Sequence, residues 1–510
     1  MTNEIDDDGF EVTTIVAVES LPTKAEPYDD LPVGLGPTPG PNTSKIAGAI
    51  AEVAQSVLDA GRADAHEVAS PATDLLRRVP PRLVGGAPLP RSGDSITDLR
   101  QALLALDRSY IAVQGPPGTG KTYVASQVVA RLVLDHGWRV GVVAQSHAAV
   151  EHLLDCIVAA GVPGEQVGKA PQSAGVERAW TVLTKAGYAS FAEGHTEAGR
   201  GYVVGGTAWD LTHEERVARG QLDLVVVDEA GQYALAPTIA CSVSGERLLL
   251  LGDPQQLPQV SQGTHAEPVD ESALGWLLDG RATMPAELGY FLGTTWRLHP
   301  ELTLPVSHLA YEGQLASHEP VTTSRALEGV EPGLHVVPVE HTDRTTSSPE
   351  EAEAIVALVR DLEGRAWTAS DSSGSPRPAR PLTPADVLVV TAYNHQVRTV
   401  RQALDAAGLP EVRVGTVDKL QGQEAPVVIV SMCASSVHDV NRGLGFLLSR
   451  NRLNVAISRA QHAAYLVMSP RLHDAAPRTP HELRALGAFM GLVDAAQSPT
   501  LGPEPGDVTG

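Results

Sequence analysis

A glycine-rich segment that ends in lysine and threonine carries the clearest chemistry in this sequence. It lies between a β-like run, residues 110–114, and a helix-like run, residues 123–134. At such a junction, backbone N–H groups turn inward to hold phosphate oxygens, and the helix N-terminus adds partial positive charge. The alternative is a Gly/Pro turn with a chance lysine, which this setting disfavours. The segment fits the pattern GxxxxGK[ST] with Gly115, Pro116, Pro117, Gly118, Thr119, Gly120, Lys121 and Thr122.

Within that pattern the last two residues have separate tasks. Lys121 is expected to reach the β- and γ-phosphates of a bound ATP, and Thr122 is expected to hold its Mg²⁺. ATP and Mg²⁺ are therefore the predicted cofactors.

Two adjacent acids end a later apolar strand, in the sequence VVVDEA over residues 225–230. In a parallel sheet, both carboxylates would lie at the strand's C-terminal edge, beside the phosphate loop. Asp228 is predicted to hold Mg²⁺ through water, and Glu229 to polarise an attacking water. Taken alone, the pair is equally compatible with a solvated turn.

A third block, GDPQQLP over residues 252–258, follows the next strand. Gln256 has the reach of a γ-phosphate sensor, and Asp253 is placed to pair near the Mg²⁺ site. The alternative is a turn built on glycine and proline.

The elements that must position these groups alternate between strand and helix. Short apolar runs separated by helical stretches predict an α/β fold with parallel sheets flanked by helices. We expect a largely irregular, partly disordered N-terminal extension over 1–95, with one amphipathic helix near its middle. Two α/β domains follow, over 96–290 and 291–475, and then a C-terminal helix and disordered tail over 476–510.

Composition limits the function classes. The net charge is −23, which opposes a general basic nucleic-acid binder but permits a narrow groove that uses dipoles, hydroxyls and a few local cations. The acidic start is not a signal peptide, and the longest apolar runs are too short to span a bilayer, so no membrane partner is expected. Three cysteines far apart in sequence predict neither a disulfide framework nor a metal site, which favours a cytoplasmic location.

These blocks, in this order, resemble superfamily 1 helicases of the branch that includes the nonsense-mediated-decay helicase. Three later blocks extend the resemblance to about residue 470: TWRLHP at 295–300, VGTVDKLQGQE at 414–424 and RLNVAISRA at 452–460. The stretches around the phosphate loop also resemble the helicase half of bacterial RecB-like nuclease–helicase fusions. The N-terminal hundred residues lack a nuclease constellation, which makes a nuclease on a separate chain a candidate partner.

The resemblance implies two RecA-like P-loop NTPase domains with ATP between them. Trp296 would stack on the adenine, and Glu424 would bind on the ribose or γ-phosphate side. Arg297 and Arg459 would approach the γ-phosphate from the second domain, as arginine fingers do. The alternative for Arg459 is an ordinary surface arginine.

Nucleic-acid contacts are also implied, at the ends of several strands. The implied contacts are Ser146, His147, Thr207, Tyr393 and Thr416. His147 is equally well explained as structural, and Tyr393 as a packed side chain.

Together these features predict an ATP-hydrolysing helicase or translocase that moves on single-stranded DNA or RNA, with DNA weakly favoured. The alternative is an ATP-switched regulatory subunit of a larger nucleic-acid-processing assembly. The acidic balance favours that alternative, and the response of the ATPase rate to single strands separates the two.

Overall fold

The computed structural model describes residues 2–5, 11–14, 42–61, 69–172, 176–259, 265–436, 440, 443–474, 477 and 479–497. The chain divides into two compact units, Met1–Asn42 and Thr43–Gly510, and each is described by itself. In the smaller unit, β1 (Thr2–Ile5) pairs antiparallel with β2 (Glu11–Thr14). Every predicted site residue lies in the larger unit.

The first half of the larger unit is built on an eight-stranded parallel sheet in the order β10-β3-β9-β8-β4-β7-β5-β6. Apart from the pairs β8–β9 and β5–β6, neighbours in this order are not neighbours in sequence, as expected when crossover connections join parallel strands. The strands are β3 (Tyr110–Gln114), β4 (Arg139–Val143), β5 (Val167–Lys169), β6 (Thr181–Val182), β7 (Tyr202–Gly206), β8 (Leu224–Val227), β9 (Leu248–Gly252) and β10 (Gly289–Phe291).

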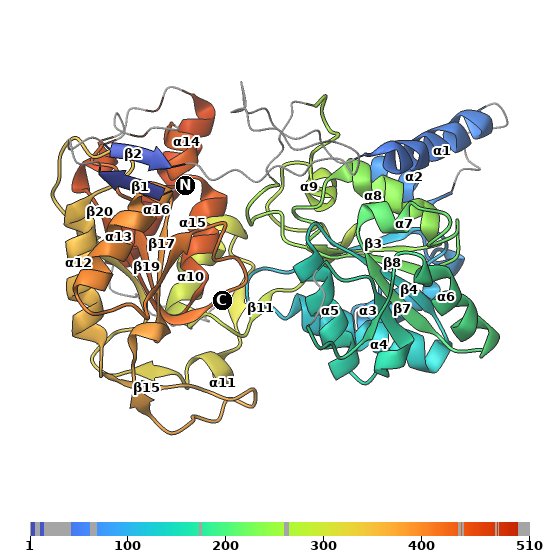
Figure 1. The fold of residues 1–510 in the computed structure, drawn as a ribbon, viewed down its shortest axis with the longest axis horizontal. Coiled ribbons are helices and arrows are strands. Elements are labelled where there is room, and N and C mark those ends of the chain that lie inside the picture. Colours follow the sequence, from blue (N-terminus) through green and yellow to red (C-terminus); the bar gives the residue numbers. More distant parts are fainter. Residues whose placement is uncertain are drawn as a thin grey trace, which may run out of the picture. The chain divides into compact units, whose positions relative to one another are not determined.

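Successive residues of these strands enter two different cores, which explains why the strands read as continuous apolar runs. Ile111 and Val113 pack under α3 (Ser95–Ala105), α4 (Lys121–His136) and α5 (His147–Ala159). Tyr110 and Ala112 pack with a second group of helices on the opposite face (Figure 1). That group is α2 (Pro71–Leu76), α6 (Gly187–Glu197), α7 (Ala208–Leu211), α8 (Leu235–Cys241) and α9 (Ala273–Leu278).

The second half contains a five-stranded parallel sheet in the order β14-β20-β19-β17-β18. One face packs against α10 (Pro300–Ala310), α15 (Arg450–Ile457) and α16 (Pro480–Gln497), and the other against α12 (Pro349–Leu362) and α13 (Asn394–Ala406). The strands are β14 (Gly333–Pro338), β17 (Val387–Thr391), β18 (Arg413–Thr416), β19 (Ala425–Ser431) and β20 (Ala460–Met468).

Short elements complete the second half. They are β11 (Thr294–Thr295), β12 (Ala316–Ser317), α11 (Glu319–Thr322), β13 (Ala326–Leu327), β15 (Ala366–Thr368), β16 (Arg380–Pro381) and α14 (Leu444–Leu447).

The predicted α/β class and the two parallel sheets are confirmed. The N-terminal extension has more structure than expected where it is described. It contains α1 (Ser44–Gly61), which packs on α8, and α2, whose Leu75 is fully buried in the first domain's core. Residues 69–95 therefore belong to the first domain instead of forming an appendage. The predicted tail after residue 497 lies outside the described residues, and the predicted boundary between residues 290 and 291 falls inside β10.

Within the described part of the chain, no helix has both the length and the apolar character that crossing a bilayer requires.

Candidate nucleotide site and nucleic-acid edge

The phosphate loop leaves the end of β3 and enters α4, as predicted. Gly118 and Gly120 adopt positive φ values of 75° and 78°, a conformation that glycine takes at little cost. The Lys121 ammonium donates to the Gly115 carbonyl at 2.5 Å, so the lysine folds back over the loop. A Cβ added at Gly115 would lie 2.2 Å from Lys121 Cγ, which shows how closely the loop wraps the lysine. The N-terminus of α4 has no side-chain cap, which suits a helix end that receives an anion.

Asp228 and Glu229 follow β8 at the same edge of the sheet. The Asp228 carboxylate is buried and accepts a hydrogen bond from the Glu229 backbone N–H at 2.9 Å. Burial, helped by the neighbouring Glu229 carboxylate, raises the pKa of Asp228 to about 7. Glu229 has a positive φ of 54°, which turns the chain sharply directly after the strand. A buried acid with a raised pKa beside a phosphate loop is a group that a bound cation would stabilise in its charged form.

The residues present therefore fit ATP and Mg²⁺. The loop offers backbone N–H groups to phosphate oxygens, and Thr122 and Asp228 are the residues that would hold Mg²⁺ together with phosphate oxygens and water. Among the described residues there is no cluster of three or more His, Cys, Asp or Glu side chains suited to a metal. A Mg²⁺ site that relies on the substrate's own phosphates does not need one.

The Asp253 carboxylate is buried and fully engaged in hydrogen bonds, so it is not a free group near Mg²⁺. Its carboxylate accepts from Gln114 Nε2 at 3.3 Å, from Gln256 Nε2 at 3.3 Å and from the Tyr311 hydroxyl at 2.7 Å. The Tyr311 hydroxyl in turn accepts from Asn454 Nδ2 at 2.8 Å. The role of Gln256 as a γ-phosphate sensor stays a prediction; one of its two amide N–H donors is used by Asp253.

Arg297 lies beside the phosphate loop, although it belongs to the second half of the chain. The Trp296 N–H donates to the Gly118 carbonyl at 2.8 Å, and the ideal Cβ position at Gly118 lies 2.5 Å from Arg297 Cβ. The Arg297 guanidinium donates to Glu424 Oε2 at 2.5 Å and to the Ser458 carbonyl at 3.2 Å. The predicted residues Arg297 and Glu424 are thus ion-paired at the loop.

Arg459 follows Ser458 directly and is almost fully buried. Its guanidinium donates to the Gln423 carbonyl at 3.2 Å and to the Val417 carbonyl at 3.1 Å. Burial, with a contribution from the nearby Arg297 charge, lowers its pKa to about 10. It still carries its charge at neutral pH. Two guanidinium groups this close repel each other, and an anion between them and the loop would relieve that repulsion.

Trp296 has a partner that sequence reasoning missed. Its ring stacks on His318, with centroids 3.7 Å apart and an interplanar angle of 13°. Its side chain remains 43% exposed, which leaves surface for an adenine. Arg325 was missed as well, because no motif surrounds it; it donates to the backbone carbonyls of Trp296 and Arg297 at 3.0 and 2.5 Å.

The predicted nucleic-acid residues of the first domain gather at one edge of its sheet. β4 pairs with β7 so that Val143 lies opposite Gly206, which brings Ser146, His147 and Thr207 to neighbouring strand ends. Ser146 is exposed and caps α5, with its hydroxyl accepting from the Ala149 N–H. The Thr207 hydroxyl donates to Asp210 at 2.9 Å in a capping box.

The two predicted contacts of the second domain are less accessible. Tyr393 and Thr416 are each 8% exposed, and the Tyr393 ring packs 5.5 Å from Phe446. Tyr393 follows β17, and Thr416 ends β18. In the structure the Tyr393 side chain is packed against its neighbours.

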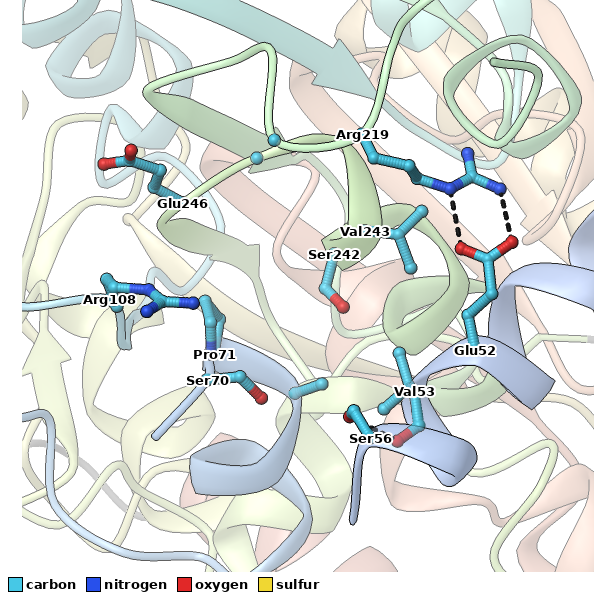
Figure 2. Close-up of a pocket in the computed structure, with 13 residues that line it drawn as sticks. Glu52, Val53, Ser56, Ser70, Pro71, Arg108, Arg219, Ser242, Val243 and Glu246 are labelled. Carbon is cyan, nitrogen blue, oxygen red and sulfur yellow. Dashed lines mark hydrogen bonds and ion pairs between the residues drawn. The ribbon is translucent and has the colours of Figure 1, made fainter. Parts of the chain in front are cut away.

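A hollow of about 500 Å³ lies elsewhere, between α1 and the chain around residues 219–220 and 242–246 (Figure 2). Arg219 crosses it to form two hydrogen bonds with Glu52 of α1, at 2.7 and 2.8 Å. No predicted site residue lines this hollow. We interpret the hollow as part of the packing interface between α1 and the first domain.

Comparisons with known proteins find AAA domains and helicases. Two family models, each described as an AAA domain, match residues 97–274 and residues 279–471. The chain is 26% identical to the DNA replication ATP-dependent helicase/nuclease DNA2 of Gallus gallus, over 72% of this chain and 35% of that protein. It is 27% identical to the DNA polymerase alpha-associated DNA helicase A of Schizosaccharomyces pombe, over 68% of this chain and 59% of that protein.

A third relative is the Regulator of nonsense transcripts 1 homolog of Drosophila melanogaster, 24% identical over 82% of this chain and 37% of that protein. This chain thus spans less than two thirds of the length of each of these relatives. A solved structure of Arterivirus nonstructural protein 10 (helicase) with DNA matches at a TM-score of 0.40 and 15% identity, covering 74% of this chain and 62% of that one. The predicted likeness to RecB-like nuclease–helicase fusions stays a prediction. The two AAA domain matches and the helicase relatives support the predicted resemblance of this chain to the superfamily 1 helicases.

Proposed function

We propose that this chain hydrolyses ATP between its two α/β halves and uses the cycle to move along single-stranded nucleic acid, with DNA preferred over RNA. One observation carries the proposal: the backbone of Trp296 is hydrogen-bonded to Gly118 of the phosphate loop, and Arg297 is bonded to Ser458, the neighbour of Arg459. These bonds support a role for Arg297 at the phosphate loop, with Arg459 following in the chain directly after Ser458.

The chemistry is an in-line displacement. Glu229 orients a water and takes up its proton as the water oxygen bonds to the γ-phosphorus. The bond between that phosphorus and the β–γ bridging oxygen breaks, and ADP leaves with the electron pair. Lys121, Arg297 and Arg459 neutralise charge on the transferred group. Bound Mg²⁺, which Thr122 and Asp228 would hold, adds positive charge at the phosphates.

Coupling to movement follows from where the arginines are attached. Arg297 and Arg459 are held by partners in the second half, so their approach to the triphosphate depends on how the halves close. Strand ends of the same sheet that carries the phosphate loop present Ser146, His147 and Thr207. A domain movement that follows the ATP cycle would move these groups along a bound strand.

The test is the rate of ATP hydrolysis by the purified chain with no nucleic acid, with single-stranded DNA and with single-stranded RNA. The proposal expects strong stimulation, greater with DNA. A flat response would instead support the alternative, an ATP-switched regulatory subunit. Equal stimulation by both strands would remove only the preference for DNA.

A cytoplasmic location and a nuclease on a separate chain stay part of the proposal. Purification of the tagged chain from fractionated cells of its own source, with mass spectrometry of bound proteins, tests both. Recovery of the chain from the membrane fraction would contradict a cytoplasmic location. The absence of any nuclease among the bound proteins would contradict the proposed nuclease partner.

A further inference from the structure

Lys169 is a fully buried lysine at the end of β5 that no motif predicted. A lysine ammonium has three N–H donors and no acceptor. All three find acceptors here: His147 Nδ1 at 2.9 Å, Glu151 Oε1 at 3.0 Å and the Ala170 carbonyl at 3.1 Å. Because all three donors of this buried ammonium are bonded, the Lys169 side chain is held in one position.

The contact with Lys169 determines the state of the His147 ring. Because the ammonium can only donate, His147 Nδ1 must accept, and an accepting Nδ1 places the ring's single proton on Nε2. Burial and the Lys169 charge lower the pKa of His147, while Asp210 and Glu151 act to raise it and Lys185 to lower it further. The ring is therefore neutral near pH 7, and its Nε2–H is a donor on a side chain that is neither fully buried nor fully exposed.

Lys169 also lies at the predicted nucleic-acid edge. β5 pairs with β7 so that Lys169 is opposite Gly205, two residues before Thr207, and β7 pairs with β4, which leads to His147. The adjacent strands β4, β7 and β5 thus end at the same edge of the sheet. Lys169 is buried there, and His147 is less buried than Lys169. Lys169 is inaccessible, so it cannot itself contact a strand.

We propose that Lys169 is a positioning residue that fixes His147 as a neutral Nε2–H donor to an acceptor oxygen or nitrogen of the bound single strand. The inference rests on the proposed function, because it names how one residue of that surface contacts the strand. It also answers how a chain of net charge −23 binds a polyanion: this contact needs no exposed cation.

The competing explanation is a purely structural ion pair. Glu151 also pairs with Arg178 at 2.7 Å, so Lys169 and Arg178 share one carboxylate. Of these two cations, Lys169 is the one with a hydrogen bond to His147. Arg178→Met is therefore a matched control for Lys169→Met: each removes one cation from Glu151 and leaves the other.

The first measurement is the tautomer of His147, from long-range ¹H–¹⁵N spectra of histidine-labelled protein without nucleic acid. Its signals are assigned by their loss in His147→Ala. We expect the Nε2–H tautomer at pH 7 in the native chain and in Arg178→Met. In Lys169→Met we expect a tautomer mixture or a protonated ring. A native ring that is protonated or carries its proton on Nδ1 would overturn the inference, as would unchanged signals in Lys169→Met.

The second measurement is affinity for a labelled single strand as salt is varied. His147→Ala and Lys169→Met should each weaken binding about 5- to 10-fold, the loss of roughly one hydrogen bond. The double variant should be no weaker than either single one, because Lys169 acts only through His147. Additive losses, or equal losses in Arg178→Met, would show a structural role and refute the inference.

The salt series adds an independent check. A neutral donor releases no counterion, so His147→Ala should leave the slope of log affinity against log salt unchanged. A slope smaller by about 0.7, the value for one lost ionic contact on a single strand, would contradict the neutral ring. If the native chain binds no single strand at all, the proposed function fails, whereas the tautomer measurement remains valid by itself.

Discussion

The two halves of the nucleotide site are held in place by different kinds of contact. In the first half, Lys121 bonds to a carbonyl six residues away, and Asp228 accepts from the next residue's N–H. In the second half, Arg297 bonds to Glu424 and to Ser458, 127 and 161 residues further along the chain. The phosphate loop is a local structure, whereas the arginines are positioned only once the whole second domain has folded.

This difference indicates a division of labour. The phosphate loop of the first half needs only one strand, one loop and one helix, so we expect the phosphates to be held there even when the arginines of the second half are removed. The second half supplies charge that matters mainly in the transition state. Variants of the two halves should therefore separate binding from turnover.

The largest effect is expected in the second half. Arg459→Ala should lower ATP turnover about 10³- to 10⁵-fold, the range for lost arginine fingers, while nucleotide binding stays within a few-fold. Stopped-flow turnover and binding of a fluorescent ATP analogue would measure the two. The control is Arg471→Ala, an exposed arginine outside the site. Loss of binding equal to the loss of turnover would erase the proposed division.

The next effect belongs to the first half. Glu229→Gln keeps the size of the side chain but removes the base, so turnover should fall about 10²- to 10⁴-fold with ATP still bound. Single-turnover hydrolysis measures the chemical step directly. A variant that hydrolyses at the native rate would mean that another group orients the water.

A smaller effect concerns the junction between the halves. Tyr311→Phe removes the hydroxyl that bonds to Asp253 and Asn454, and leaves buried polar groups short of a partner. We expect a loss of about 1–3 kcal/mol in the free energy of unfolding, measured by urea denaturation. Tyr123→Phe, at a side chain that is 62% exposed, should change stability by no more than about 0.5 kcal/mol. Equal effects at both positions would show that the junction contributes nothing.

The smallest effect is expected at the ion pair. The Glu424 side chain is 44% exposed, so solvent screens its attraction to Arg297. Glu424→Gln should change stability by less than about 1 kcal/mol. A loss several times larger would mean that the pair holds the second half together, and that Arg297 cannot leave Glu424 for a phosphate.

The same comparison explains what could be predicted from the sequence. The phosphate loop is one run of consecutive residues, and the pair Asp228 and Glu229 is another, so each motif also specifies its own local geometry. The start of α12 is also specified locally, because Ser348 caps this helix and Pro349 begins it. By contrast, the pairing of Arg297 with Glu424 and the stacking of Trp296 on His318 arise from tertiary folding.

Residues outside motifs were missed for a related reason. The sequence around Lys169 contains no motif and gives no periodic signal. Its contact with His147 becomes visible only when β4, β5 and β7 are placed side by side in the sheet. For Gln256 the motif and the structure give different information. Its motif predicted a phosphate sensor, and the structure bonds its side chain to Asp253.

The central claim is most directly tested by a structure of this chain with ADP, aluminium fluoride, Mg²⁺ and a single strand. Aluminium fluoride occupies the place of the transferred phosphoryl group. We predict that the guanidinium groups of Arg297 and Arg459 both contact it, opposite Lys121 and with Arg297 released from Glu424. The account would be contradicted by a complex in which the nucleotide sits on the phosphate loop while Arg297 is still bonded to Glu424 and Arg459 is still bonded to backbone carbonyls.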